Sequence, residues 1–398
     1  MVPELRKKFN QEFKEENYQS FLNELNSYYP NQLDFRVAET PIFVPRYFKE
    51  KILSACESIV DIIIQPDYIQ QSEKAIPNHL KVPGQDSFPH FIAFDFGVCV
   101  NEQNELEPQL IEMQGFPTLF AYEPLLTEVF RKYFHWPDNY SDYLSGLSKD
   151  EYLQILKRIV VGDENPENVV LLELFPHKQK TRIDFYCSEK SLGIATVDLN
   201  DVIKQGKKLY YIKEGRKIQI NRIYNRLIFD DLFQQPQDIQ DKGKFFHEEL
   251  EVTWVPHPNW FYRISKYSLP FIDHPYVPET RFLDQIKSVP PDLENYVVKP
   301  LFSFAGQGVI IDVSKKDIEK IPDKENWILQ RKVNYAPVIE TPNEPAKAEI
   351  RMFYFWEPGK PRPIPTNNLA RLSKGKMIGV RYNKDKDWVG GSFALFEK

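Results

Sequence analysis

The segment NYVVKPLFSFAGQGVIIDV, residues 295–313, constrains the fold more than any other part of the chain. Its two apolar runs predict two β-strands, and the loop between them carries Ser303, Gly306 and Gly308. Lys299 lies near the end of the first strand, just before this loop. Small residues let backbone N–H groups approach phosphate oxygens closely, and a neighbouring lysine adds positive charge. The pattern therefore predicts a phosphate-binding loop, with an ordinary glycine-containing hairpin as the alternative.

A second predicted strand, WILQRKV, spans residues 327–333. It is apolar up to Gln330 and then leads into Lys332 and Val333. Backbone groups and one side-chain amide at the end of a strand could recognise the edge of an adenine ring. We therefore take these residues as candidate nucleotide contacts.

A third predicted strand, AEIRMFYFW, spans residues 348–356 and places Glu349 and Arg351 on the same face, two residues apart. This face could meet the phosphates of a nucleotide. Taken alone, the two charges fit an exposed salt-bridging pair equally well, because most charges on strands are solvated.

Acidic residues that suit a metal ion occur near the front of the chain. FIAFDFGVCV (91–100) and QLIEMQ (109–114) are predicted strands, and the polar turn between them predicts a hairpin. Asp95 lies on the first strand, and Glu112 and Gln114 lie on the second, so the two acids could face each other. Oxygen ligands of this kind suit Mg²⁺ that bridges nucleotide phosphates.

The order of these motifs resembles the circularly permuted ATP-grasp group, which includes glutathionylspermidine synthetase. In that group the metal acids precede the lysine loop, as they do here. A second nucleotide-binding lysine precedes a short run that ends in Leu-Pro, which matches Lys266 before Leu269 and Pro270. The resemblance covers most of residues 90–398 in order, as short motifs.

The resemblance implies ATP and Mg²⁺ as cofactors. It also implies a ligase that joins a carboxylate, on a small molecule or a peptide, to an amine through an acylphosphate. Arg351 and Lys299 are then the expected catalytic residues. The expected nucleotide contacts are Lys266, Lys299, Ser303, Gly306, Gly308, Gln330, Lys332 and Val333, and the expected metal ligands are Asp95, Glu112 and Gln114.

Two departures from the family pattern leave a second function open. The family usually has Asn where this chain has Gln114, and an arginine where this chain has Ala93. These differences put turnover in question more than ATP binding. The alternative is therefore a catalytically inactive ATP-binding module that acts as a sensor or binds a partner. A structural protein that binds no nucleotide is a third hypothesis.

The expected fold is α/β (α+β): a circularly permuted ATP-grasp-type body with a small inserted α/β substrate domain and an N-terminal helical layer. The predicted regions are 1–84 for the helical layer, 85–159 for the metal-binding part of the body, 160–238 for the substrate domain and 239–398 for the ATP-binding part. Within the substrate domain, IYNR (223–226) is either a substrate-contacting segment or a buried strand that ends in a polar turn.

Local patterns predict further elements. Residues 4–28 carry apolar residues at helical spacing and predict one helix. TRIDFYCSEKSLG (181–193) predicts a helix that stops at Gly193. IQINRIYNRL (218–227) and KMIGVRYN (376–383) are predicted strands.

Composition excludes several other classes of protein. The net charge of -6 argues against a protein that coats nucleic acid. Three widely spaced cysteines form no CxxC pair, so we expect free thiols in a reducing compartment. The charged first residues contain no apolar signal region, and no uncharged apolar run approaches 18 residues. The sequence therefore predicts a cytoplasmic protein that does not interact with a membrane.

Overall fold

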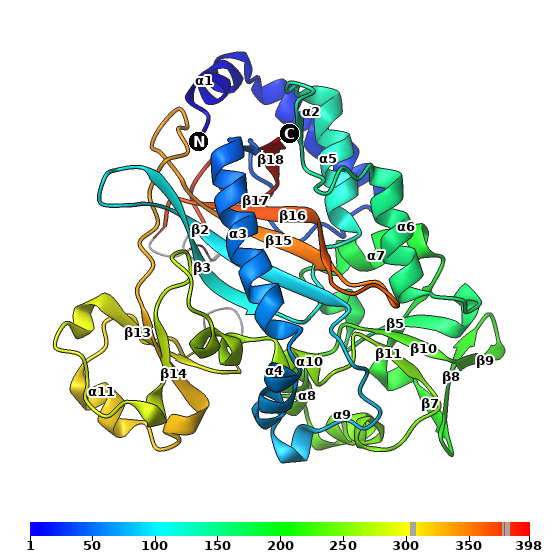
Figure 1. The fold of residues 1–398 in the computed structure, drawn as a ribbon. Coiled ribbons are helices and arrows are strands. Elements are labelled where there is room, and N and C mark those ends of the chain that lie inside the picture. Colours follow the sequence, from blue (N-terminus) through cyan, green and yellow to red (C-terminus); the bar gives the residue numbers. More distant parts are fainter. Residues whose placement is uncertain (303–307, 376–377, 379–382) are drawn as a thin grey trace.

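The computed structural model describes residues 1–302, 308–375, 378 and 383–398. A five-stranded antiparallel sheet with the order β17-β16-β15-β2-β3 lies at its centre (Figure 1). Its strands are β2 (Phe91–Val100), β3 (Leu106–Gln114), β15 (Lys347–Phe355), β16 (Ile364–Ser373) and β17 (Gly390–Ser392). The sheet thus joins the hairpin near the front of the chain to strands near its end. The predicted hairpin is confirmed by the pairing of β2 with β3.

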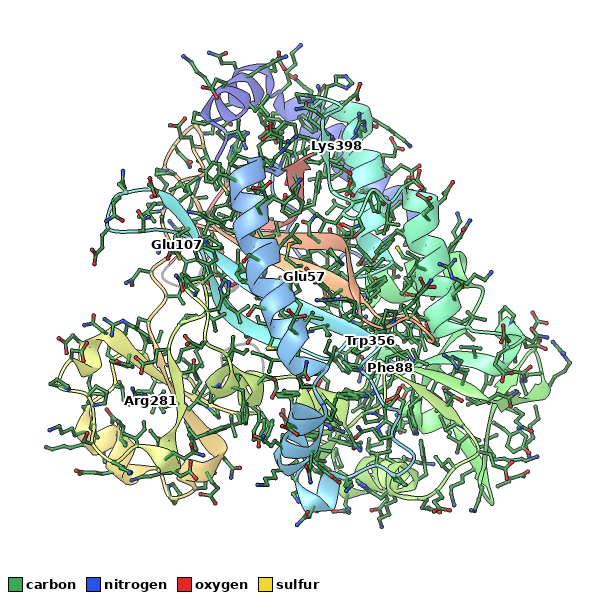
Figure 2. The ribbon with its side chains drawn as sticks, in the orientation of Figure 1. Glu57, Phe88, Glu107, Arg281, Trp356 and Lys398 are labelled. Atoms are coloured by element: carbon green, nitrogen blue, oxygen red, sulfur yellow. The ribbon has the colours of Figure 1, made fainter. Side chains whose placement is uncertain are left out.

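Both faces of this sheet are covered, which explains why β2 is an almost continuous apolar run. Helix α3 (Arg46–Ile63) packs on one face, where alternate β2 residues such as Phe94 and Phe96 share a core with Ile52 and Ile59. Figure 1 shows α3 crossing in front of the sheet. The opposite face packs against α5 (Tyr122–Tyr133) and α6 (Lys149–Val160). Beyond the end of β15, Trp356 packs on Phe88 with ring centroids 5.0 Å apart (Figure 2).

The N-terminal helical layer differs from the prediction of one helix over residues 4–28. The chain forms α1 (Pro3–Glu12) and α2 (Glu15–Tyr28), with extended backbone at Phe13 and Lys14 between them. The break lets Phe13 pack against Trp388, near the end of the chain, with the two rings tilted. A second small sheet, β1-β18-β4, also ties the two ends of the chain together. Its strands are β1 (Ile42–Val44), β4 (Tyr140–Ser141) and β18 (Ala394–Glu397).

The middle of the chain forms a parallel four-stranded sheet with the order β11-β10-β5-β6. Its strands are β5 (Val169–Glu173), β6 (Ala195–Asp198), β10 (Arg222–Asn225) and β11 (Thr253–Val255), so it includes one strand beyond the predicted region 160–238. Helix α7 (Arg182–Leu192) ends at Gly193, which has φ +79° and provides the predicted stop.

An antiparallel ribbon adjoins this sheet and consists of β7 (Ile203–Gln205), β8 (Lys208–Lys213) and β9 (Arg216–Ile220). The run IQINRIYNRL (218–227) was predicted as one strand. Instead it divides at Asn221 between β9 of the ribbon and β10 of the parallel sheet.

A third unit contains the three-stranded sheet β12-β14-β13 and helix α11 (Lys315–Lys320). Its strands are β12 (Thr280–Phe282), β13 (Tyr296–Pro300) and β14 (Trp327–Arg331). The predicted strand over residues 308–313 forms only a single β-bridge, from Ile310 to Val298. The predicted strand over 376–383 lies largely outside the described residues.

Short helices complete the described structure: α4 (Pro66–Gln71), α8 (Phe229–Phe233), α9 (Gln237–Lys242), α10 (Trp260–Arg263) and the 3₁₀ turn η7 (Lys266–Phe271). The three cysteines are buried free thiols, as expected. In the described part of the chain, no helix has both the length and the apolar character that a bilayer crossing would require.

Candidate active site

The candidate site lies where the three-stranded sheet meets β3, an edge strand of the five-stranded sheet. The Nζ of Lys299, on β13, donates to the backbone oxygen of Ile111, on β3, over 3.3 Å. This contact brings the predicted lysine beside Glu112, the predicted metal acid. The structure therefore unites two motifs that are 187 positions apart in the sequence (299 − 112).

Lys299 is held by two side chains from its own sheet. Its Nζ donates to the Oε1 of Gln330 over 2.6 Å, and the Nε2 of Gln330 donates to the hydroxyl of Thr280 over 3.1 Å. Burial lowers the pKa of Lys299 to about 8, although Glu112 acts in the opposite direction. The nearby charge of Lys266 lowers this pKa further. Two cations therefore lie close together in a poorly solvated place.

Lys266 begins η7 and is 6% exposed. Burial lowers its pKa, whereas the carboxylates of Glu112 and Asp230 raise it. The segment that carries Lys266 is fixed against the end of β3, because the N–H of Gly115 donates to the oxygen of Ile264 over 2.8 Å. A Cβ on Gly115 would lie 2.7 Å from the carbonyl oxygen of Trp260, so only glycine fits this approach.

Asp95 and Glu112 are direct cross-strand partners on β2 and β3, as the sequence predicted. Their surroundings differ. The Asp95 side chain is only 2% exposed, and both of its oxygens accept hydrogen bonds from the guanidinium of Arg351, its partner on β15. The Glu112 side chain is 31% exposed, and its carboxylate lies 3.8 Å from Arg351.

A second arginine extends this cluster. Arg371, on β16, donates to Asp95 over 2.9 Å and also to Glu349. The other oxygen of Glu349 accepts from the hydroxyl of Tyr335 over 2.6 Å. Glu349 and Arg351 are therefore not the exposed pair that the sequence left open, because each is bound to groups on neighbouring strands. Sequence reasoning missed Arg371, which lies on an unpredicted strand, and Tyr335, which lies in a loop.

The remaining predicted nucleotide contacts are only partly brought together. The Gln330 side chain is fully buried and is engaged by Lys299 and Thr280. Lys332 and Val333 follow β14 directly, and the Lys332 N–H donates to the oxygen of Asn295 over 2.7 Å.

The loop after Lys299 is described only at its end. Gly308 has φ +72°, and a Cβ there would lie 3.1 Å from the ring of Pro300, the neighbour of Lys299. Ser303 and Gly306 lie outside the described residues. Gln114 pairs with Ala93 across the hairpin and donates its amide N–H to the oxygen of Phe116 over 3.1 Å. Its amide oxygen is the atom of this side chain that could meet a metal ion.

The residues at this junction meet some, but not all, requirements of a site for a nucleotide and its magnesium ion. Two desolvated lysines beside a partly exposed carboxylate provide charge for phosphates and one oxygen donor for a cation. Mg²⁺ in nucleotide sites often takes only one or two protein carboxylates and completes its shell with water and phosphate. Among the described residues, no three His, Cys, Asp or Glu side chains are arranged to hold a metal ion by themselves. Glu112 fits such a shared site, whereas Asp95 is occupied by arginine in this arrangement.

Comparison with solved structures gives the fold. The chain superimposes on the apo structure of a glutathione synthetase-like effector from Globodera pallida with a TM-score of 0.60. The match covers 97% of this chain and 98% of that one at 10% sequence identity. The chain has a mixed α/β fold similar to this structure. The sequence matches no family model and no curated protein.

Proposed function

We propose that this chain is an ATP- and Mg²⁺-dependent carboxylate–amine ligase with a circularly permuted ATP-grasp-type body. One observation carries the proposal: Lys266 and Lys299 converge beside Glu112 at the junction of two sheets, in poorly solvated surroundings that lower both lysine pKa values. Burial of two neighbouring cations is costly unless an anion compensates for it. A nucleotide triphosphate is such an anion. The likeness in fold to a glutathione synthetase-like protein supports the same conclusion.

The proposed nucleotide site uses both sides of the junction. Lys266 and Lys299 neutralise phosphate oxygens, and Gln330 holds Lys299 in place. With the Gln330 side chain engaged in this way, the backbone around Lys332 and Val333 is left to meet the adenine edge. Ser303, Gly306 and Gly308 remain the predicted phosphate contacts after Lys299.

The acidic hairpin carries the residues that would hold the metal ion. Glu112 would be the principal protein ligand, with Gln114 and Asp95 as the further predicted ligands. When bound, the ion supplies charge neutralisation between phosphates. Asp95 can serve as a ligand only when it releases Arg351, which makes Glu112 the more direct contributor.

The proposed reaction forms and breaks two bonds in sequence. A substrate carboxylate oxygen attacks the γ-phosphorus of ATP, so that an acylphosphate forms and ADP leaves. The amine then attacks the acyl carbon, so that an amide forms and inorganic phosphate leaves with release of the amine proton. Little covalent chemistry falls to the protein, whose work is positioning and stabilisation of charge.

Arg351 is the proposed catalytic residue for the transferring phosphoryl group. The family pattern places an arginine two residues before the metal aspartate, where this chain has Ala93. Arg351 brings a guanidinium to Asp95 from the neighbouring strand instead. We propose that it supplies the missing positive charge, and that Arg371, on β16, helps to hold the same aspartate.

Phosphate release with pairs of acids and amines tests the ligase proposal. The purified protein, with Mg-ATP, is screened against small-molecule and peptide carboxylates combined with primary amines and polyamines. We expect phosphate release that requires both an acid and an amine, and that is lost in Arg351→Ala and retained in Arg281→Ala. Arg281 is an exposed arginine on β12, in the same three-stranded unit as the lysine loop (Figure 2). Release that needs neither co-substrate would contradict a ligase.

A catalytically inactive ATP-binding module is the second candidate, and one specific observation favours it. Both oxygens of Asp95 are bound by Arg351, and Arg371 binds one of them as well, so the arginines and the acid neutralise each other. If this arrangement persists when nucleotide binds, neither the aspartate nor the arginine reaches the phosphates. Tight Mg-ATP binding without phosphate release across the whole screen would favour this function.

A further inference from the structure

We propose that Tyr335 is a positioning residue that connects the three-stranded unit to the arginine cluster and thereby controls recognition of the γ-phosphate. The inference rests on the proposed nucleotide site and concerns a residue that the sequence did not single out. Tyr335 lies where the chain passes from one sheet to the other.

That crossing occurs within four residues. The N–H of Lys332 still bonds to Asn295 of the three-stranded unit, over 2.7 Å. The N–H of Ala336 already bonds to the oxygen of Val98 on β2, over 2.9 Å. Tyr335 lies between these two anchors, in the segment that links β14 to β15.

The ring of Tyr335 is fixed against β2 by a glycine. A Cβ on Gly97 would lie 2.9 Å from Cε1 of Tyr335, a separation that carbon atoms do not adopt without displacement. Gly97 pairs with Glu349 across β2 and β15. The absence of a side chain at position 97 therefore lets the tyrosine lie flat enough to reach Glu349.

The hydroxyl of Tyr335 determines how Glu349 meets Arg371. One carboxylate oxygen of Glu349 accepts from Tyr335, and the other accepts from Arg371. With one oxygen occupied, Glu349 engages Arg371 through a single oxygen, and Arg371 still donates to Asp95. Burial, and then the charge of Glu349, raises the pKa of Tyr335 well above its usual value, so the hydroxyl remains a donor.

Loss of this hydroxyl leaves both oxygens of Glu349 available to Arg371. A carboxylate and a guanidinium prefer to pair through two parallel hydrogen bonds. Arg371 would then turn toward Glu349 and away from Asp95. Asp95 would be left to Arg351 alone and would hold it more tightly, away from the phosphate. The expected consequence is weaker binding of the γ-phosphate, with little change at the lysines.

The test compares a non-hydrolysable ATP analogue with ADP, each with Mg²⁺, by isothermal titration calorimetry. For Tyr335→Phe we expect the ratio of analogue to ADP affinity to fall about tenfold, the effect of one hydrogen bond to a charged group. The ADP affinity should stay within about twofold, because Lys299 is held by Ile111 and Gln330, whereas Tyr335 bonds to Glu349. Gly97→Ala, which displaces the ring, should lower the ratio in the same direction.

Tyr354→Phe is the matched control. Tyr354 lies on the same strand as Glu349 and donates to Glu57 of α3 over 3.0 Å, on the face away from the arginines. It should leave the ratio unchanged. An unchanged ratio in Tyr335→Phe, with ADP still bound, would overturn this inference and leave the proposed function intact. Absence of nucleotide binding by the wild-type chain would instead overturn the proposed function, and this inference with it.

Discussion

The two ends of the candidate site differ in how closely acidic side chains pair with the positive ones. At the lysine end, Lys266 and Lys299 both lie near Glu112, Asp230 also acts on Lys266, and burial lowers both lysine pKa values. At the arginine end, Arg351 and Arg371 are matched by Asp95 and Glu349 within hydrogen-bonding distance. At the first end burial disfavours the charged form of both lysines, so an anionic ligand would stabilise them. The second end is already compensated, so a ligand must displace an internal partner.

This difference has a consequence for function. The lysine end should bind nucleotide readily, whereas the arginine end should engage only when the γ-phosphate competes successfully with Asp95. Binding and turnover would then depend on different residues. Variants at each end can therefore test whether the two ends differ in this way.

The largest expected effect is on stability, at the arginine end. Asp95→Ala leaves Arg351 and part of Arg371 without their buried partner, so we expect the free energy of unfolding to fall by about 3 kcal/mol. Urea denaturation of the unliganded protein measures this change in the free energy of unfolding. Asp61→Ala, at an exposed acid that pairs with Arg362, is the control and should cost less than about 1 kcal/mol. Equal effects in the two variants would mean that the cluster around Asp95 is solvated.

At the lysine end the expected effect is on binding. Lys299→Met removes a desolvated charge that a phosphate would pair with, so we expect Mg-ATP affinity to fall about 100-fold. The unliganded protein should stay within about 1 kcal/mol of wild type, because removal of the buried charge offsets the loss of the hydrogen bond to Gln330. Calorimetry and urea denaturation measure the two quantities. Lys316→Met, at an exposed lysine of α11, is the matched control and should change neither.

The smallest effect is the pH dependence of binding. Because the pKa of Lys299 is lowered to about 8, the free protein loses this proton as pH rises past that value. Phosphate binding favours the charged lysine, so binding above pH 8 requires uptake of a proton. We expect Mg-ATP affinity to be nearly constant from pH 6.5 to 7.5. Above the pKa, it should fall by up to about tenfold per pH unit.

The pH profile of Lys299→Met separates this residue from other titrating groups. The variant should lose most of the decline above pH 8, although Lys266, whose pKa is also lowered, retains part of it. A decline of the same size in wild type and variant would place the titrating group elsewhere.

The parts of the fold that the sequence predicted are those with a strong local pattern. The hairpin of β2 and β3 follows from a ten-residue apolar run, a polar turn and a second apolar run, and its pairing puts Asp95 opposite Glu112. The stop of α7 follows from Gly193. In these places, local backbone preferences and tertiary packing favour the same structure.

The parts that the sequence did not predict depend on tertiary contacts. Strand β16 contains Asn367 and Asn368, which are polar yet fully buried. The Asn368 side chain bonds to the backbone of Ala394 and Asp142, an arrangement that no local pattern reveals. Arg371 lies on the same strand and was missed for the same reason. The break between α1 and α2 carries no glycine or proline and follows from the packing of Phe13 on Trp388.

Thermal unfolding with and without Mg-ATP, on wild type and on Glu112→Ala, tests the central claim most directly. At about 100 times the dissociation constant, a ligand that binds only the folded state stabilises it by about 2.7 kcal/mol. We expect Mg-ATP to raise the melting temperature of wild type clearly, and to raise that of Glu112→Ala less or not at all. No rise in wild type, or an equal rise in both proteins, would contradict a magnesium–nucleotide site at the junction of Glu112, Lys266 and Lys299.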